Sequence, residues 1–231
     1  MIPFPKPQSD EFAISPEDAF IVRLCGIDPG TDKLGMSFLD MDVRTNTIVG
    51  VQAFTIHASR LSTQRAWIEE IRSARHMRLK ALEDNVTRIL RRLTPISVAC
   101  ESPFFNSLHP GAFEALVQAV CALSTALFRY DPWQAMVNID PMTVKKVVGA
   151  SYSAKKSAGK TREEKKREVQ EALIVHPLLQ VSGNQCLVTA DEHAVDATAI
   201  ALYLYLTYYK PKSNMYPIVP KEIAFNYPNI V

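Results

Sequence analysis

Glycine and cysteine are scarce in this sequence, and it opens without an apolar signal core. It contains 8 glycines and 4 cysteines among 231 residues, a composition that excludes collagen-like and disulfide-stapled proteins. No two cysteines have the Cys-x-x-Cys spacing of zinc or redox motifs. We also find no run of about 20 apolar residues, the length that a membrane span needs. These absences predict a cytoplasmic globular protein that is neither secreted nor membrane-spanning.

Charge is nearly balanced over the whole chain but unevenly distributed along it. There are 26 Lys and Arg residues against 24 Asp and Glu residues. Residues 60–92 and residues 145–171 each carry nine basic side chains against four acidic ones, so each stretch has a net charge of +5. Two basic stretches on an otherwise acidic body favour a polyanionic partner. The alternative is that they form two solvated helix faces.

Proline marks both ends of the chain. Residues 1–20 hold four prolines and scattered charge, which predicts an irregular N-terminal arm. Residues 210–231 hold four more among apolar side chains, so we expect a C-terminal tail that lies along the domain or along a partner. Residues 21–209 then form one folded domain, of a size that sustains a single core.

Apolar periodicity predicts the order of elements in residues 21–209. Strands over 21–28, 34–41 and 47–56 form an antiparallel meander. A helix over 62–93 that ends before Pro95, a strand over 96–101, an apolar helix over 112–128 and a strand over 135–139 follow. A short helix over 143–148, a basic loop over 151–161 and a helix over 162–175 precede the last helix, which we expect to begin at the capping box Thr189 to Glu192 and to run to about Tyr208. This order predicts an α/β fold, a mixed five-stranded sheet with helices on both faces.

Three carboxylates stand in unusually apolar surroundings. Asp28 ends the first strand, Glu101 ends the fourth, and Asp196 lies one turn inside an apolar helix, three residues after His193. Burying an unpaired charge costs several kcal/mol of folding free energy, which a charged partner or a bound metal ion can offset. Each could instead have a structural role, as a turn former, an ion-pair partner or a backbone cap. Together they favour a cluster that holds two Mg²⁺ ions, or Mn²⁺ in their place, for phosphodiester hydrolysis.

Five segments, in order, resemble the motifs of RuvC-type Holliday-junction resolvases. They are Gly26-Ile-Asp-Pro-Gly-Thr-Asp-Lys-Leu-Gly35, Ala99-Cys-Glu-Ser-Pro-Phe104, Thr143-Val-Lys-Lys-Val-Val-Gly149, Lys166-Arg-Glu-Val-Gln170 and His193-Ala-Val-Asp-Ala-Thr-Ala-Ile200. The resemblance implies an RNase H-like fold, a homodimer, and metal-dependent symmetric nicking of four-way DNA junctions in the cytoplasm of a bacterium or of a virus-infected cell.

The resemblance also implies residue roles. The metal-binding catalytic set would be Asp28, Glu101, His193 and Asp196, with Lys145 and Lys166 near the scissile phosphate. Phe104 would stack on bases at the opened crossover. The basic residues expected to contact DNA are Lys146, Lys155, Lys156, Lys160, Arg162, Lys165 and Arg167. The helix over 112–128 would form the dimer surface, because a two-fold substrate suits a two-fold enzyme.

Three other functions compete with this one. An ATPase of the actin and sugar-kinase type would need further glycine-rich phosphate loops, and after residue 111 only Gly149, Gly159 and Gly183 remain. A related nuclease that cuts RNA/DNA hybrids, forks or flaps would use the same acids. A non-enzymatic branched-DNA binding protein would need only the two basic stretches.

Overall fold

The computed structural model describes residues 20–61, 73–104, 110–147 and 161–210. Strands β1 (Ile21–Asp28), β2 (Lys33–Asp42) and β3 (Thr47–His57) form an antiparallel meander. Strand β4 (Ser97–Glu101) pairs with β1 in parallel, and β5 (Val137–Ile139) pairs with β4 in parallel. The sheet order is β3-β2-β1-β4-β5, which confirms the predicted mixed five-stranded sheet.

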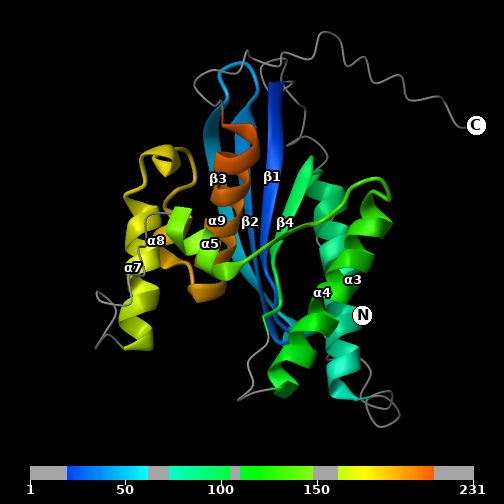
Figure 1. The fold of residues 1–231 in the computed structure, drawn as a ribbon. Helices are drawn as coiled ribbons and strands as arrows, with labels where there is room; N and C mark the ends of the chain where they lie inside the picture. The colour runs from blue at the N-terminus through cyan, green and yellow to red at the C-terminus, as the bar shows by residue number, and fades with distance from the viewer. Residues whose placement is uncertain (1–19, 62–72, 105–109, 148–160, 211–231) are drawn as a thin grey trace, which may run out of the picture.

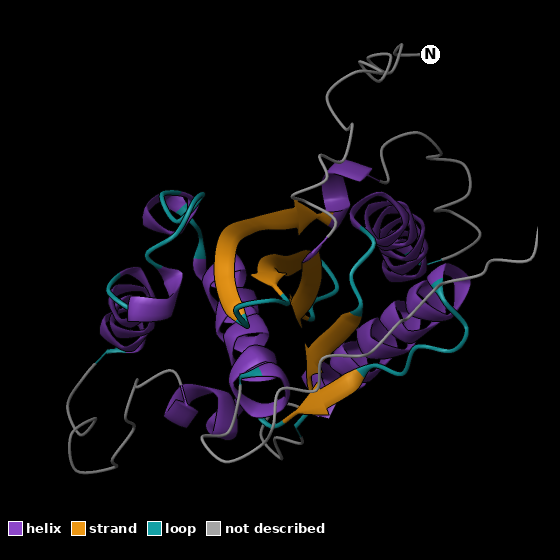
Figure 2. Cartoon of the chain, turned by 90° about the horizontal axis from the view of Figure 1, so that it is seen from above, coloured by secondary structure: helices purple, strands orange, loops and turns teal. Residues whose placement is uncertain are grey.

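Helices cover both faces of this sheet, as predicted (Figures 1 and 2). One face carries α3 (Ala74–Leu93) and α4 (Pro110–Tyr130). The other carries α9 (Glu192–Leu204), which packs on β1 and β2 and is flanked by α5 (Pro141–Val147) and α7 (Arg162–Ile174). The described residues also include the short elements α1 (Ala58–Leu61), η2 (Pro177–Leu179), α8 (Cys186–Thr189) and η3 (Tyr205–Tyr209). Nearly all of both predicted terminal arms lies outside the described residues.

Alternation along the strands divides the buried side chains into two cores. Leu24 and Cys25 are adjacent and fully buried, yet Leu24 packs in the core beneath α9 and Cys25 in the core beneath α3 and α4. Successive side chains of a strand point to opposite faces, so a central strand with helices on both sides is apolar throughout. This is why β1 reads as one continuous apolar run.

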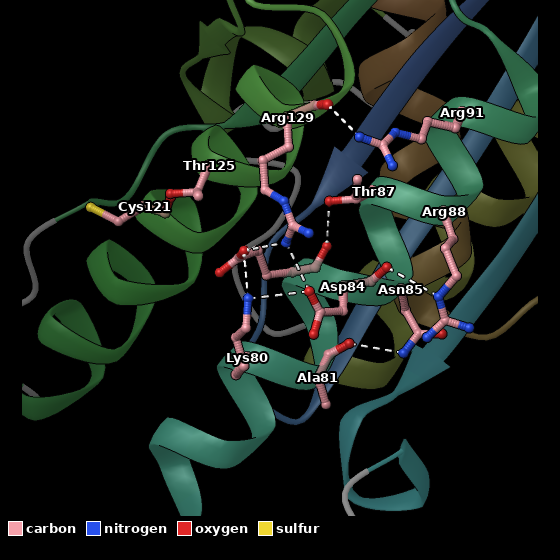
Figure 3. A network of polar contacts seen from close by, with 11 residues as sticks. Lys80, Ala81, Asp84, Asn85, Thr87, Arg88, Arg91, Cys121, Thr125 and Arg129 are labelled. Carbon is pink, nitrogen blue, oxygen red and sulfur yellow. Dashed lines mark hydrogen bonds and ion pairs between the residues drawn. The ribbon is translucent and has the colours of Figure 1, made fainter.

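A network of charges joins α3 to α4 (Figure 3). The Arg129 guanidinium donates to Glu83 at 2.7 Å and to Asp84 at 2.8 Å, and the Lys80 ammonium donates to the same two carboxylates at 2.9 and 3.2 Å. Helix α3 ends at Leu93, where Thr94 adopts a left-handed conformation with φ 44°, so the predicted stop before Pro95 is confirmed. The predicted start of that helix lies outside the described residues.

Helix α4 is apolar around most of its circumference but buries only one stripe. Ala119, Leu123, Ala126 and Leu127 are buried, whereas Phe128 is 65% exposed. By length and composition alone this helix could cross a membrane, a property that core helices of soluble proteins also show. Polar residues such as Glu114 and Gln118 interrupt this helix, so the sequence contains no unbroken apolar run of that length. The buried stripe packs α4 onto α3 and the sheet.

The predicted start of the last helix is wrong. Thr189 ends the short helix α8, and its hydroxyl donates to the carbonyl of Cys186 at 3.5 Å. Asp191 caps α9 instead, because its carboxylate accepts from the Ala194 amide at 3.1 Å. Both residue types are good N-caps, and the packing of α8 decides between them. A complete capping box does occur at Thr161, before α7.

Candidate active site

Asp28 and Glu101 lie side by side at the C-terminal ends of the neighbouring strands β1 and β4. In the parallel pairing of β1 with β4, Ile27 stands opposite Cys100, so the next residue of each strand is a carboxylate. Ile27 and Cys100 face the core beneath α3 and α4, so alternation turns Asp28 and Glu101 toward α9. Burial raises the pKa of the Cys100 thiol, and the charges of both carboxylates raise it further. The sequence prediction that two carboxylates leave neighbouring parallel strands at one edge is confirmed.

His193 meets Asp28 across 165 residues of sequence. Its Nδ1 lies 2.7 Å from Oδ2 of Asp28, and the two side chains are 26% and 14% exposed. Because a carboxylate can only accept, the proton of this hydrogen bond lies on Nδ1. The bond raises the pKa of His193 against the lowering effect of its burial. The Nε2 atom stands 3.6 Å from Oε1 of Glu192.

Two glycines allow α9 to approach the sheet closely enough for this contact. A Cβ at Gly35 would lie 1.9 Å from the carbonyl oxygen of His193, and a Cβ at Gly26 would lie 2.2 Å from that of Ala197. Gly35 is also the direct partner of Asp28 in the antiparallel ladder. The absence of side chains at these positions therefore sets the distance between the strand that carries Asp28 and the helix that carries His193.

A hydrogen bond from β3 anchors the start of α9, and the sequence analysis missed it. The Thr55 hydroxyl donates to the carboxylate of Asp191, the residue that caps α9. Burial would raise the pKa of Asp191, but the hydrogen bonds from Thr55 and from the Ala194 amide outweigh it and lower the pKa. The sequence did offer a signal, because Asp191 stands two residues before His193 and aspartate is a good N-cap residue.

The four predicted metal ligands are assembled only in part. Asp28 and His193 are in contact, Glu101 lies at the same edge, and Asp196 is half-buried one turn after His193 on α9. Among the described residues, no three His, Cys, Asp or Glu side chains are grouped closely enough to hold a metal ion. The donor chemistry of three carboxylates and one imidazole nevertheless fits a hard divalent cation.

Phe104 lies three residues after Glu101 and is 55% exposed; its role in stacking stays a prediction. Of the predicted phosphate and DNA contacts, Arg167 is exposed and pairs with Glu171 at 3.0 Å. The others lie on α5 and α7, where their side chains are not described, or outside the described residues: Lys145, Lys146, Arg162, Lys165 and Lys166 in the first group, and Lys155, Lys156 and Lys160 in the second. Both helices pack against α9.

Comparison with known proteins agrees with this architecture. No protein-family model matches the sequence. Thermus thermophilus RuvC in complex with a Holliday junction substrate is 20% identical, and the alignment covers 78% of this chain and 91% of that chain at a TM-score of 0.50. The fowlpox virus resolvase in complex with Holliday junction DNA is 14% identical over 80% of this chain and 97% of that chain, with a TM-score of 0.48. The yeast mitochondrial Holliday junction resolvase is 13% identical over 78% and 76%, also with a TM-score of 0.48.

The mixed five-stranded sheet and the helices on both of its faces match the expectation from the sequence. The likeness to the Thermus protein extends over most of both chains. This chain therefore has the RNase H-like fold of the RuvC-type Holliday junction resolvases.

Proposed function

We propose that this protein is a metal-dependent endonuclease that cuts four-way DNA junctions by symmetric phosphodiester hydrolysis. One observation carries the proposal: Asp28 and Glu101 leave neighbouring parallel strands on the side of the sheet where His193 of α9 contacts Asp28. Acidic groups gathered at the carboxyl ends of parallel strands are typical of a reaction site, because the ends of several strands converge there. The fold that this chain shares with RuvC supports the choice of substrate.

Asp28, Glu101, His193 and Asp196 would hold two Mg²⁺ ions, for which Mn²⁺ would substitute. When bound, such ions supply an acidified water and positive charge at the leaving oxygen. Asp28 orients the imidazole of His193 through Nδ1, which leaves the lone pair of Nε2 available as a ligand or a proton acceptor. To share an ion with the Asp28–His193 pair, the side chains of Glu101 and Asp196 would have to come closer to it. Because the strand and the helix that carry them are packed in the core, this movement would be a rotation of the side chains.

Positive charge and an exposed aromatic side chain would position the DNA. Lys145 of α5 and Lys166 of α7 belong to helices that pack on α9, so both would lie near the phosphate and stabilise its transition-state charge. The exposed ring of Phe104 would stack on an unpaired base at the crossover. These contacts favour a branched substrate over intact duplex, because a duplex offers no unstacked base.

The outer face of α4 would pair two copies of the chain. Phe128 is 65% exposed there, and Cys121 is exposed about two helical turns earlier on the same face. A two-fold contact through this face would place two active sites on one junction, which symmetric cleavage requires. We propose a homodimer on this basis.

A panel of labelled substrates tests the proposal. Four-way junction, flap, fork, linear duplex and RNA/DNA hybrid are incubated with the protein in Mg²⁺ and in EDTA. We expect paired symmetric nicks in the junction, dependent on Mg²⁺. Faster cutting of the hybrid would instead support the second candidate, an RNase H-like nuclease of broader specificity, for which the same acids would serve.

Asp28→Asn separates chemistry from binding. It removes the carboxylate charge while keeping the shape of the side chain, so cleavage should fall by at least about 10³-fold, whereas junction binding in EDTA should stay within about twofold. Asp40→Asn, at a carboxylate of β2 that pairs with Arg23 near the opposite end of β1 from Asp28, is the matched control and should cleave at the wild-type rate. Binding lost in proportion to cleavage would make Asp28 a structural residue and would contradict the proposed site.

A further inference from the structure

Two basic side chains are paired at one end of the β2–β3 ladder. Lys33 is the first residue of β2 and His57 is the last residue of β3. The two are direct partners in the antiparallel register, and such partners have Cβ atoms about 4.5–5.5 Å apart. Lys33 and His57 are therefore neighbours on one face of the sheet.

Strand alternation places both side chains on the face that α9 covers. A Cβ at Gly35 would lie 1.9 Å from a backbone carbonyl oxygen of α9. Thr55 pairs with Gly35, and its hydroxyl donates to the residue that caps α9. The two basic residues lie two positions nearer the end of the ladder, about 7 Å along the strands, so they project from this same face. They therefore extend the sheet surface beyond the first turn of α9.

The candidate active site lies at this same end of the sheet. Asp28 is the partner of Gly35 in the ladder of β1 with β2, and Lys33 is two residues beyond Gly35 on β2. The hydrogen bond to Asp28 raises the pKa of His193 and burial lowers it, while the positive charge of Lys33 also acts to lower it. The Lys33 ammonium is thus close enough to the Asp28–His193 pair for its charge to act there.

The backbone that carries the two basic residues is held in place. A Cβ at Gly30 would lie 2.1 Å from the Lys33 carbonyl oxygen, so the turn between β1 and β2 is closely packed. The amide of the buried Ala58 donates to the carbonyl of Asp32 at 2.7 Å. This bond joins the residue after His57 to the residue before Lys33. The pair is therefore presented in a preorganised arrangement, which favours binding.

Both side chains are available to a ligand. Lys33 is exposed and His57 is half-buried. Among the residues that the structure describes, neither side chain has a hydrogen-bond or ion-pair partner. A lysine ammonium supplies three donors and an imidazole N–H supplies another, and phosphate oxygens accept from both residue types. The chemistry of the pair fits an anion that carries several oxygen acceptors.

We propose that Lys33 and His57 bind a backbone phosphate of the DNA strand that enters the active site. This inference rests on the proposed nuclease function and adds a contact from the sheet to those expected from α5 and α7. The Lys33 ammonium supplies positive charge, and the His57 ring N–H donates a hydrogen bond to the same phosphate. Contacts to phosphates fix the register and orientation of DNA without reading its sequence. The pair would thus hold the strand beside Asp28 and His193.

The salt dependence of DNA binding tests this proposal without any cleavage. Fluorescence anisotropy measures the Kd of the full chain for a labelled four-way junction in EDTA. Each lost phosphate contact lowers the slope of log Kd against log salt concentration by about 0.9. Lys33→Met should therefore bind more weakly than wild type, and the ratio of the two Kd values should fall about sixfold between about 0.05 and 0.4 M KCl. Lys33→Arg keeps the charge and should keep the wild-type slope.

A second variant tests the shared phosphate. His57→Leu removes the hydrogen-bond donor and should weaken binding about 2-fold to 10-fold. In the Lys33→Met and His57→Leu double variant, the loss should be smaller than the product of the two single losses, because both groups hold the same phosphate. Losses that multiply fully would overturn the shared site.

Lys210→Met is the matched control. Lys210 is an exposed lysine that directly follows η3, beyond the opposite end of α9 from His193, so its loss should leave the slope unchanged. If wild type binds and cuts the junction while Lys33→Met keeps the wild-type slope, this inference is overturned and the nuclease proposal stands. A wild-type protein that binds no junction would overturn both.

Discussion

Gly35→Ala would test the close approach of α9 to the sheet. The new Cβ would lie 1.9 Å from the His193 carbonyl oxygen, and about 1.1 Å of movement is needed to reach even 3.0 Å. Since Gly35 pairs directly with Asp28, that movement separates Asp28 from His193. Their hydrogen bond of 2.7 Å would open to about 3.8 Å, beyond the usual limit for N–H···O contacts.

We expect two measurable consequences. A misplacement of about 1 Å costs about 10²-fold in the cleavage rate, and overpacking costs about 1–3 kcal/mol of stability. For a domain of this size the latter lowers the Tm by about 2–12 °C. Single-turnover cleavage of a four-way junction in Mg²⁺ and thermal unfolding in EDTA measure the two effects separately.

Gly50→Ala in β3 is the matched control. The nearest atom to its new Cβ is Oδ2 of Asp40 at 3.4 Å, an ordinary contact, so both rate and Tm should stay near the wild-type values. A Gly35→Ala protein that cleaves at the wild-type rate would refute the reasoning, because α9 would then not need its close approach to position His193.

Three further predictions concern the anchor of α9, the network between α3 and α4, and the outer face of α4. Thr55→Val removes the hydrogen bond to Asp191 and should slow cleavage about 10-fold to 100-fold, with junction binding in EDTA unchanged. Thr55→Ser keeps the hydroxyl and should cleave at the wild-type rate. A Thr55→Val protein as fast as wild type would show that this hydrogen bond does not position α9. Arg129→Met should lower the urea midpoint at pH 7. Burial raises the pKa of Asp84, but hydrogen bonds that include one from Arg129 lower it overall. The stabilisation by this ion pair is therefore present above the ordinary aspartate pKa of about 3.9 and is lost as pH falls through the lower pKa of the folded state. If the urea midpoints of wild type and Arg129→Met did not converge in acid, this origin would be contradicted. Maleimide labelling of the exposed Cys121, followed by mass spectrometry, should be slow in concentrated protein and fast on dilution, and a rate independent of concentration would count against α4 as the dimer surface.

Much of the site follows from local patterns. An apolar run that ends in aspartate at position 28, and another that ends in glutamate at position 101, are visible in the sequence because buried strands exclude charge except at their ends. The exposure of Phe104 and the burial of Cys25 also agree with their local surroundings. The residue that caps α9 was not predictable, because Thr189 and Asp191 are both good caps and only the packing of α8 and the hydroxyl of Thr55 select the aspartate.

The sequence by itself determined the order of the strands and helices and which residues end the central strands, since both depend on periodicities of two and of 3.6 residues within short segments. Only the tertiary structure decided that His193 contacts Asp28 through Nδ1, that the hydrogen atom at Gly35 leaves room for the backbone of α9, and that the Thr55 hydroxyl of β3 donates to the residue that caps α9. These features join residues far apart in the chain. Their distances depend on how sheet and helices pack, which no local pattern records.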